Sequence, residues 1–371
     1  MNVKKSWFLV FMAALMMVVL AACGGESESD VAGESGEAGE GTTSESTSGG
    51  TLNLLVWEGF ADPAIISDYE KEYGVKVNAV YFGSSDELLA KLKSGGGSTY
   101  DLISPSGDLS GLLVQENMLE PIDMSKITNF GDIDDGLKLP EVEKDGEVYG
   151  VPYVWGPNYF IYDADVHEEP ITSWNDFSKP EFAGQVSLSD DINNLYMAGQ
   201  ALGVANIYQM SEEELQKAKE LVETWEPQVR KYWATAGELN DLFANKEVSM
   251  ALGWPLTVKQ LNDQGRNLKW SIPEEGTTGW MDHYMIVKGA KNKANAELFI
   301  DYSIRPEVQA NTAAALYYTP VNLKATEFMS EDLQEATNVN EMESMFAKID
   351  FWQYVPDRNR YNEVWTEIKT N

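Results

Sequence analysis

A tryptophan and an aspartate stand two residues apart in Gly279–Val287, which reads GWMDHYMIV. If this segment is a strand, its side chains alternate between two faces, and Trp280, Asp282 and Tyr284 share one face. A carboxylate beside an indole, about 7 Å away along the strand, is a plausible clamp for a cation. The same pattern is also typical of a strand end with a solvated aspartate and a tryptophan in the core, and the segment alone leaves both interpretations open.

Several other predicted strands end on, or are closely followed by, an aromatic side chain or a carboxylate. These residues are Trp57, Asp108, Asp191 and Trp254. In open α/β sheets, ligands bind beyond the carboxyl ends of the strands. One such residue would be ordinary packing, but the repetition predicts two sheets that face a shared cleft.

The elements that position these residues follow from local signals. The run 51–57 is rich in Leu and Val and predicts a buried strand; Asp62, Pro63 and Gly74 then predict the cap, first turn and stop of a helix. A second strand over 75–82 precedes a helix capped by Ser84 or Ser85 and stopped at Gly95. Strands that alternate with helices in this way predict an α/β class with largely parallel sheets.

The N-terminus predicts export. Lys4 and Lys5 precede an apolar stretch that reaches Leu20 and closes on Leu-Ala-Ala-Cys, which predicts a signal peptide over 1–22. This ending resembles a bacterial lipobox, which implies cleavage before Cys23 and acylation of its sulfur. An ordinary signal peptide with a chance cysteine is the alternative. Cys23 is the one cysteine of the chain, so no disulfide is expected within the mature body.

An acidic Gly/Ser/Glu stretch over 23–50 lacks aromatic and basic residues, which predicts a disordered tether. The chain has a formal net charge of −33, and most of that charge belongs to the body from Thr51 to Asn371. Such a surface repels nucleic acid and anionic lipid and favours cationic solutes, although exported proteins are often acidic for solubility alone.

Nearly the whole body resembles the spermidine/putrescine-binding proteins, the solute receptors of ABC importers. The segments that carry the resemblance are LNLLVWEGF, YDLISPS, ITNFGDID, YGVPYVWG, ITSWNDFSKPEFAGQVSLSDD, GWMDHYMIVKGAKNK and YYTPVN. It implies a two-lobed periplasmic-binding-protein fold (type II-like), in which each lobe is a mostly parallel sheet flanked by helices and the ligand lies between the lobes. We expect one lobe over 51–155 and 281–323, and the other over 156–280 and 324–371.

Carried over position by position, the resemblance implies a set of ligand contacts. They are Trp57, Glu58, Phe60, Ser106, Asp108, Asp191, Asn194, Trp254, Trp280, Asp282, Tyr317 and Gln353. The aromatic residues would enclose the aliphatic chain of a polyamine, and Asp282 and Asp191 would each receive an ammonium group. Asp191 follows Asp190 in a turn-like segment, where capping of a helix is the alternative role.

Four positions depart from the family pattern. Glu58 stands where a threonine is usual, Phe60 and Asp108 where tyrosines are usual, and Asn194 where a glutamate is usual. These changes leave open a zwitterionic or quaternary amine such as γ-aminobutyrate or betaine. A zwitterion would need a partner for its carboxylate, and the candidates are Arg230, Arg266, Arg305 and Asn194.

Two other classes remain as alternatives. Acid pairs with aromatic side chains also suit a sugar receptor of the same architecture or a secreted glycosidase. No GxSxG or HExxH motif occurs, and His167 and His283 do not have metal-ligand spacing. We therefore expect a monomeric binding protein without enzymatic activity, cofactor or metal. It would deliver a small cationic amine to membrane permease subunits while anchored by lipid to the outer face of the cytoplasmic membrane. We expect Trp155, Trp174, Trp225 and Trp233 to be structural.

Overall fold

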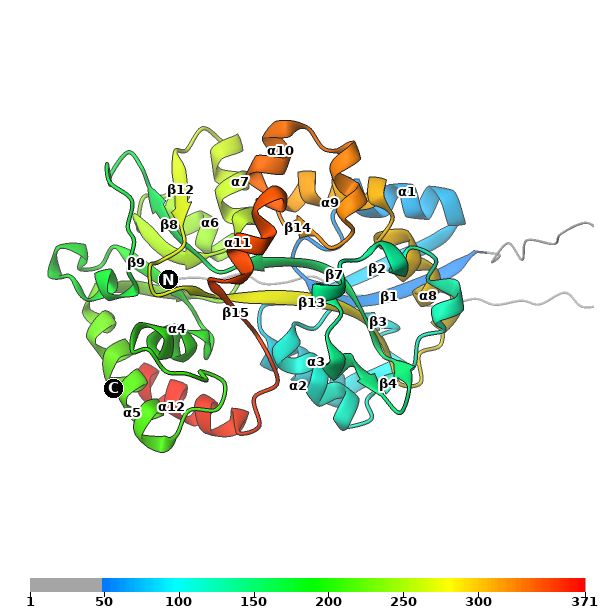
Figure 1. Ribbon diagram of the computed structural model, residues 1–371, viewed down its shortest axis with the longest axis horizontal. Coiled ribbons are helices and arrows are strands. Elements are labelled where there is room, and N and C mark those ends of the chain that lie inside the picture. The colour runs from blue at the N-terminus through cyan, green and yellow to red at the C-terminus, as the bar shows by residue number, and fades with distance from the viewer. Residues whose placement is uncertain (1–48, 371) are drawn as a thin grey trace, which may run out of the picture. The chain divides into compact units, whose positions relative to one another are not determined.

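The computed structural model describes residues 49–370, so the predicted signal peptide, Cys23 and nearly all of the predicted tether lie outside the described residues. The first sheet, around which we define lobe 1, has eight strands (Figure 1). Its main path runs β14 (Thr319–Pro320), β7 (Gly150–Pro157), β13 (Thr277–Val287), β3 (Leu102–Ile103), β1 (Gly50–Trp57) and β2 (Val75–Phe82), while β4 (Leu119–Glu120) and β15 (Ile349–Phe351) pair with β13. The helices of this lobe are α1 (Pro63–Tyr73), α2 (Ser85–Gly95), α3 (Gly107–Gln115), α8 (Lys293–Ser303) and α9 (Pro306–Leu316).

The first two helices of lobe 1 begin where their caps predict. The Asp62 side chain accepts a hydrogen bond from the backbone N–H of Ala64, Pro63 opens α1, and Gly74 closes it in the left-handed conformation with φ of 66°. The hydroxyl of Ser84 accepts from the backbone N–H of Glu87 at the start of α2. The predicted caps of both helices are confirmed.

Lobe 2 is built on a five-stranded sheet. In order across the sheet, its strands are β10 (Val229–Trp233), β9 (Val186–Ser189), β11 (Met250–Gly253), β8 (Tyr159–Asp163) and β12 (Leu268–Ser271). The helices around it are α4 (Asn193–Ala201), α5 (Glu212–Trp225), α6 (Ala236–Ala244), α7 (Pro255–Asp263) and α12 (Arg358–Thr370). Further short elements are α10 (Glu331–Ala336), α11 (Met342–Phe346) and a hairpin of β5 (Glu143–Lys144) with β6 (Glu147–Val148), and several 3-10 turns connect the elements.

The expectation of mostly parallel sheets is wrong for both lobes. Only β2, β1 and β3 in lobe 1 and β10, β9 and β11 in lobe 2 form parallel runs, together with the β13–β15 pair. Strands β7, β8 and β12 pair antiparallel with their neighbours, and β13 pairs antiparallel with β3, β4 and β7. The physical reason is that the chain crosses between lobes in both directions, so a returning strand enters a sheet against the direction of its neighbours.

The crossings lie close together and are tied to one another. The chain leaves β7 at Pro157 and enters β8 at Tyr159, with Asn158 between them. The Asn158 side-chain amide donates to the Thr278 hydroxyl over 2.7 Å, and the Thr277 hydroxyl donates to the Asn158 carbonyl over 2.5 Å. A further crossing leads from β15 to α12. Figure 1 shows the two long strands β7 and β13 running side by side.

Helix α12, although it ends the described chain, belongs to lobe 2. It packs against α5, where Arg360 pairs with Glu212 and Lys219 pairs with Glu367. The Trp365 indole also donates a 2.9 Å hydrogen bond to Asp190, which follows β9. These contacts fix the start of α12 relative to the lobe 2 sheet. Within residues 49–370, none of the helices has both the length and the apolar character needed to span a membrane.

Candidate functional site

Two adjoining pockets lie where the carboxyl end of β1 faces lobe 2. The larger has an empty volume of about 630 Å³, part of it open solvent, and the smaller about 300 Å³. Trp57, Trp254 and Trp352 line both, which makes them one continuous candidate site. The larger pocket is further lined by Gly83, Ser84, Glu87, Asn158, Ser189, Asp190, Asp191, Asn193, Trp233, Ala234 and Leu252. The smaller is further lined by Glu58, Phe60, Ser106, Trp280, Asp282 and Tyr318.

Aromatic rings from both lobes form the walls of the site. Trp57 of lobe 1 meets Trp254 of lobe 2 edge-on, with ring centroids 5.9 Å apart. Trp254 in turn meets Trp233 at 4.8 Å, while Trp280 meets Tyr318 at 4.5 Å in the smaller pocket. Edge-to-face contacts of this kind hold the rings in fixed orientations. The faces left uncovered can then receive methylene groups or a cation.

Asp282 lies in the smaller pocket and is only 3% exposed. It accepts a hydrogen bond from the Ser106 hydroxyl, and the two residues also form an isolated antiparallel bridge. Burial raises the pKa of Asp282 well above its usual value, the Ser106 hydrogen bond opposes that shift, and the charge of Asp108 adds to it. A carboxyl group in this state gains most from a ligand that brings a positive charge.

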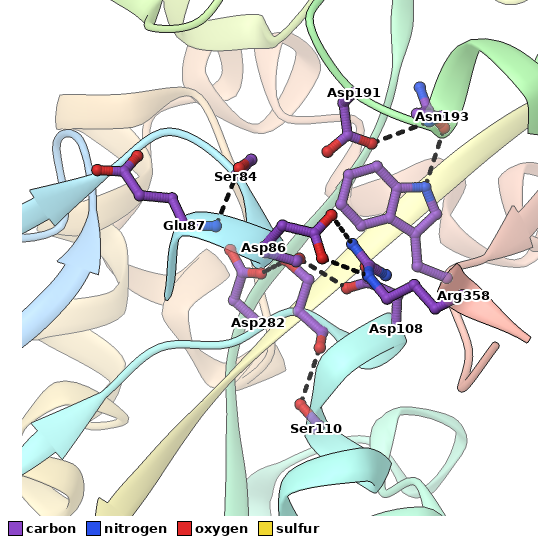
Figure 2. Close-up of polar contacts among 12 residues, drawn as sticks. Ser84, Asp86, Glu87, Asp108, Ser110, Asp191, Asn193, Asp282 and Arg358 are labelled. Carbon is purple, nitrogen blue, oxygen red and sulfur yellow. Dashed lines mark hydrogen bonds and ion pairs between the residues drawn. The ribbon is translucent and has the colours of Figure 1, made fainter. Parts of the chain in front are cut away.

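Asp191 lies in the larger pocket, close to the start of α4. Its carboxylate accepts a 2.9 Å hydrogen bond from the backbone N–H of Asn193 at the start of α4, and it also lines the pocket (Figure 2). Burial raises its pKa to about 6, the charge of Arg358 lowers it, and the charges of Asp108 and Asp86 raise it. The ionisation of Asp191 therefore changes in the range between pH 5 and pH 7.

Two glutamates line the rim from lobe 1. Glu87 accepts from the backbone N–H of Gly83 at 2.8 Å and pairs with Lys91 at 2.7 Å. Desolvation raises the pKa of Glu87, but these two partners outweigh it and leave the pKa below its usual value. Glu58, the residue that replaces the usual threonine, is exposed and lines the smaller pocket. Both add negative charge near the entrance.

Eight of the twelve residues that the sequence points to as ligand contacts line this site. They are Trp57, Glu58, Phe60, Ser106, Asp191, Trp254, Trp280 and Asp282. Four do not. Asp108 is buried in an ion pair with Arg358, and Asn194 uses its amide to donate to the carbonyls of Ser189 and Asp191.

The other two lie one residue away from a lining residue. Tyr317 lines a separate pocket beside α7, where Lys259 lies 5.2 Å from its ring centroid, and its neighbour Tyr318 faces the site instead. Gln353 is exposed, and its neighbour Trp352 lines both pockets. Tyr317 has φ of 57° at the end of α9, a left-handed cap that rotates the following residue toward the site.

Sequence reasoning missed several lining residues. Trp233 was expected to be structural, yet it lines the larger pocket as well as packing in a core. Its signal was available, because it ends β10 as Trp57 ends β1. Glu87 lies in the first turn of α2, and β2, which precedes that helix, ends at the site. This position follows from the order of the strands in the sheet and not from the sequence around Glu87. Trp155, Trp174 and Trp225 are fully buried.

Among the described residues that line the two pockets, none is Lys, Arg or His. The arginines considered as partners for a ligand carboxylate are engaged elsewhere: Arg230 with Glu247, Arg266 with Asp163 and Arg305 with Glu72. Within residues 49–370 there is also no group of three or more His, Cys, Asp or Glu side chains placed to hold a metal ion. The site therefore combines aromatic faces with carboxyl groups, of which Glu87 and Asp190 have lysine partners outside the lining, whereas Asp282 has no cationic partner among the described residues.

Comparisons with known proteins place this chain in a family. A family model described as bacterial extracellular solute-binding protein matches residues 64–341. The spermidine/putrescine-binding periplasmic protein of Salmonella typhimurium is 28% identical over 322 residues, which cover 86% of this chain and 91% of that protein. The putrescine-binding periplasmic protein PotF of Escherichia coli is 27% identical over 343 residues, covering 86% and 91%.

Solved structures agree with these relatives. A putative spermidine/putrescine ABC transporter from Listeria monocytogenes superposes with a TM-score of 0.78 and 27% identity, covering 86% of this chain and 98% of that one. These relatives are substrate-binding proteins of transport systems. The chain has the two-lobed periplasmic-binding-protein fold and belongs to the bacterial extracellular solute-binding proteins, a class of binding proteins and not of enzymes.

Proposed function

We propose that this protein captures a linear polyamine of the spermidine or putrescine type and delivers it to an ABC importer. One observation carries the proposal: the described lining of the site offers carboxyl groups and aromatic faces but no cationic side chain. An ammonium group that enters such a site replaces its lost hydration with a carboxylate or a π-face. An anionic or zwitterionic ligand finds no opposite charge for its carboxylate there.

The two pockets suit a ligand with a charge at each end. Asp282 and Ser106 would receive one ammonium group in the smaller pocket. Asp191 would receive the other in the larger pocket, and Trp57, Trp254 and Trp352 lie between them in both linings. Methylene groups between two ammonium ends would contact these rings. The names of the relatives from Salmonella and E. coli support the same ligand class.

Calorimetric titration of the chain with spermidine, putrescine, betaine, γ-aminobutyrate and maltose tests the proposal. We expect binding of the di- or triamine that weakens as salt rises, because the contacts are charge-assisted. Binding of maltose alone would support a sugar receptor. Binding of betaine or γ-aminobutyrate without any polyamine binding would contradict the polyamine proposal and leave the fold and family intact.

A zwitterionic ligand is the second candidate, and one observation favours it. The indole N–H of Trp280 is buried and has no hydrogen-bond partner among the described residues. An unpaired donor of this kind suits an acceptor oxygen on a ligand. The titration separates the two, because a zwitterion would bind with little dependence on salt compared with a triamine.

We further propose that Cys23 carries a lipid that anchors the exported protein to the outer face of the cytoplasmic membrane, where its permease subunits lie. The lipobox-like ending Leu-Ala-Ala-Cys and the acidic spacer that follows support this proposal. Metabolic labelling with a radioactive fatty acid should label the wild-type chain and leave Cys23→Ser unlabelled. A wild-type chain that stays unlabelled and is released in soluble form would indicate an ordinary signal peptide.

A further inference from the structure

A buried arginine from lobe 2 joins two acidic side chains of lobe 1 (Figure 2). Arg358 opens α12, and its guanidinium donates to both carboxylate oxygens of Asp86 in α2, from Nε over 3.0 Å and from Nη2 over 3.2 Å. Its third contact runs from Nη1 to Asp108 in α3 over 2.6 Å. The Ser85 hydroxyl donates a 3.0 Å hydrogen bond to the other oxygen of Asp108. We call these three charged residues, Arg358, Asp86 and Asp108, the clasp.

The clasp bridges parts of the protein that are otherwise held separately. Helix α12 is fixed to lobe 2 through α5 and Asp190, as described above, whereas α2 and α3 follow strands of the lobe 1 sheet. The segment 352–357 leads from β15 to Arg358, and it begins with Trp352, which lines both pockets. The lobes cannot separate at this end of the site without breaking the ion pairs of Arg358.

Because these ion pairs are buried, the loss of one partner is costly. Arg358 is 8% exposed and Asp108 is 4% exposed, so both charges lose most of their water when the lobes are together. A two-pronged contact between guanidinium and carboxylate is among the strongest charge-assisted hydrogen bonds, and removal of one partner leaves a buried charge without compensation. When the lobes part, water can solvate all three groups, so breaking the clasp destabilises the closed arrangement specifically.

A second close approach shows that the lobes are together in this structure. An added Cβ on Gly83, at the end of lobe 1 strand β2, would lie only 2.2 Å from the carbonyl oxygen of Ala234 in lobe 2. The two lobes are thus in contact at Gly83, where backbone meets backbone, and at the clasp, where side chains meet. Gly83 and Ala234 line the larger pocket, and the charge of Arg358 acts on Asp191, which lines the same pocket.

We propose that Arg358 is a positioning residue that holds the lobes closed over the ligand and thereby sets how slowly the ligand leaves. The carboxyl groups of the site repel one another when the lobes approach, and Arg358 supplies from within the chain one of the positive charges that offset this repulsion. The statement about how slowly the ligand leaves rests on the proposed function, whereas the statement that Arg358 holds the lobes closed does not.

The test compares Arg358→Gln with Arg360→Gln in the full chain. Arg360 is a matched control, since it lies one half-turn away on α12 and pairs with Glu212, Glu363 and Glu367, all within lobe 2. Closure is followed by energy transfer between dyes on Lys93→Cys and Thr366→Cys, one on each lobe, in a Cys23→Ser background. Ligand dissociation is followed by stopped flow with spermidine or putrescine, whichever binds.

We expect Arg358→Gln to shift the dye pair toward the open distance and to raise the dissociation rate at least tenfold, while Arg360→Gln changes neither. Arg358→Lys should restore part of the effect, because it keeps the charge but loses the forked contact. Unchanged dye distance and dissociation rate in Arg358→Gln would overturn the proposal. If no tested amine binds, the proposed function fails, and the dye distance alone still decides the role of the clasp.

Should Arg358→Gln fail to fold, Asp86→Asn provides the milder variant. The Asp86 side chain is 41% exposed, so its replacement leaves no fully buried defect. We expect a several-fold faster dissociation and a partial shift toward the open distance. Asp86→Asn that behaves as wild type in both measurements would overturn the proposal.

Discussion

The protein contains two acidic clusters near the same cleft, Asp86 with Asp108 in the clasp and Asp282 with Glu58 in the smaller pocket. They differ in whether the chain itself supplies a positive charge. In the clasp, Asp86 and Asp108 receive the guanidinium of Arg358 from the chain itself. In the smaller pocket, Asp282 has the Ser106 hydroxyl as a partner and no cationic side chain in the described lining. On the proposals above, the first cluster is complete and holds the lobes together, and the second cluster is left incomplete for a ligand.

The largest expected effect comes from Asp282→Asn, which removes the charge of the incomplete cluster. Hydrogen bonds between charged partners contribute about 1.5–3 kcal/mol, so the affinity for a polyamine should fall by roughly 10- to 150-fold in calorimetry. Asp263→Asn is a matched control, since Asp263 pairs with Lys259 on the exposed face of α7. Equal affinity in wild type and Asp282→Asn would show that the smaller pocket does not hold an ammonium group.

The same variant should become more stable without ligand. Because the folded-state pKa of Asp282 is raised above its unfolded value, its contribution to stability is present at low pH and is lost as pH rises through the folded pKa. At pH 7 Asp282→Asn escapes this cost, so its thermal midpoint in the ligand-free state should exceed that of wild type. The difference should shrink toward pH 4, and a variant less stable than wild type at pH 7 would contradict this reasoning.

Gly83→Ala tests whether closure itself is needed. Its methyl group would meet the Ala234 carbonyl oxygen across the cleft, and the lobes would have to stay slightly apart. We expect a loss of affinity of about tenfold or more with little change in thermal stability, because the clash exists only when the lobes are closed. Gly131→Ala, whose added Cβ meets nothing within 4 Å and which, like Gly83, has no left-handed φ, is a control for the added methyl group alone.

A smaller effect should follow pH through Asp191. Its pKa of about 6 means that the carboxylate is mostly ionised at pH 7 and mostly neutral at pH 5. Since an ammonium group binds the ionised form, affinity should fall by about tenfold from pH 7 to pH 5 on account of this residue. His283, whose pKa burial lowers to about 3, does not contribute in this range. In Asp191→Asn this part of the pH dependence should vanish. If the variant and the wild type have the same pH profile of affinity, a group other than Asp191 causes the pH dependence.

The smallest effect separates two adjacent tyrosines. Tyr318→Leu should weaken binding by about 1 kcal/mol through lost aromatic contact with Trp280 and the ligand, whereas Tyr317→Leu should leave affinity within error. Calorimetry on the two variants side by side provides the measurement. The opposite result would restore Tyr317, the residue that the family resemblance implies.

The sequence predicted most of what depends on local order along the chain. The strand ends at Trp57 and Trp254 and the caps at Asp62 and Ser84 follow from neighbouring residues alone, because a cap or a strand end is a short-range feature. The sheet directions could not be predicted in the same way. Whether β13 pairs parallel or antiparallel depends on which lobe the chain came from, and that is a property of the whole path.

The site was predictable where a residue stands on a strand and less so where it stands on a turn. One residue of shift separates Tyr317 from Tyr318 and Gln353 from Trp352, since a left-handed cap or a crossing segment decides which side chain faces the cleft. The clasp was out of reach, because Arg358 lies 250 residues from Asp108 along the chain and nothing near either residue signals the other. An ion pair between residues far apart in the chain produces no pattern in the sequence around either residue.

The crowding of indoles around the site also gives the protein an optical property. Of the 11 tryptophans in the chain, Trp57, Trp233, Trp254, Trp280 and Trp352 line the two pockets. Indole emission responds to nearby charge and to water, and a bound cation would change both for these five rings at once. The unmodified protein should therefore report its own occupancy as a change in intrinsic fluorescence, without any dye or engineered cysteine.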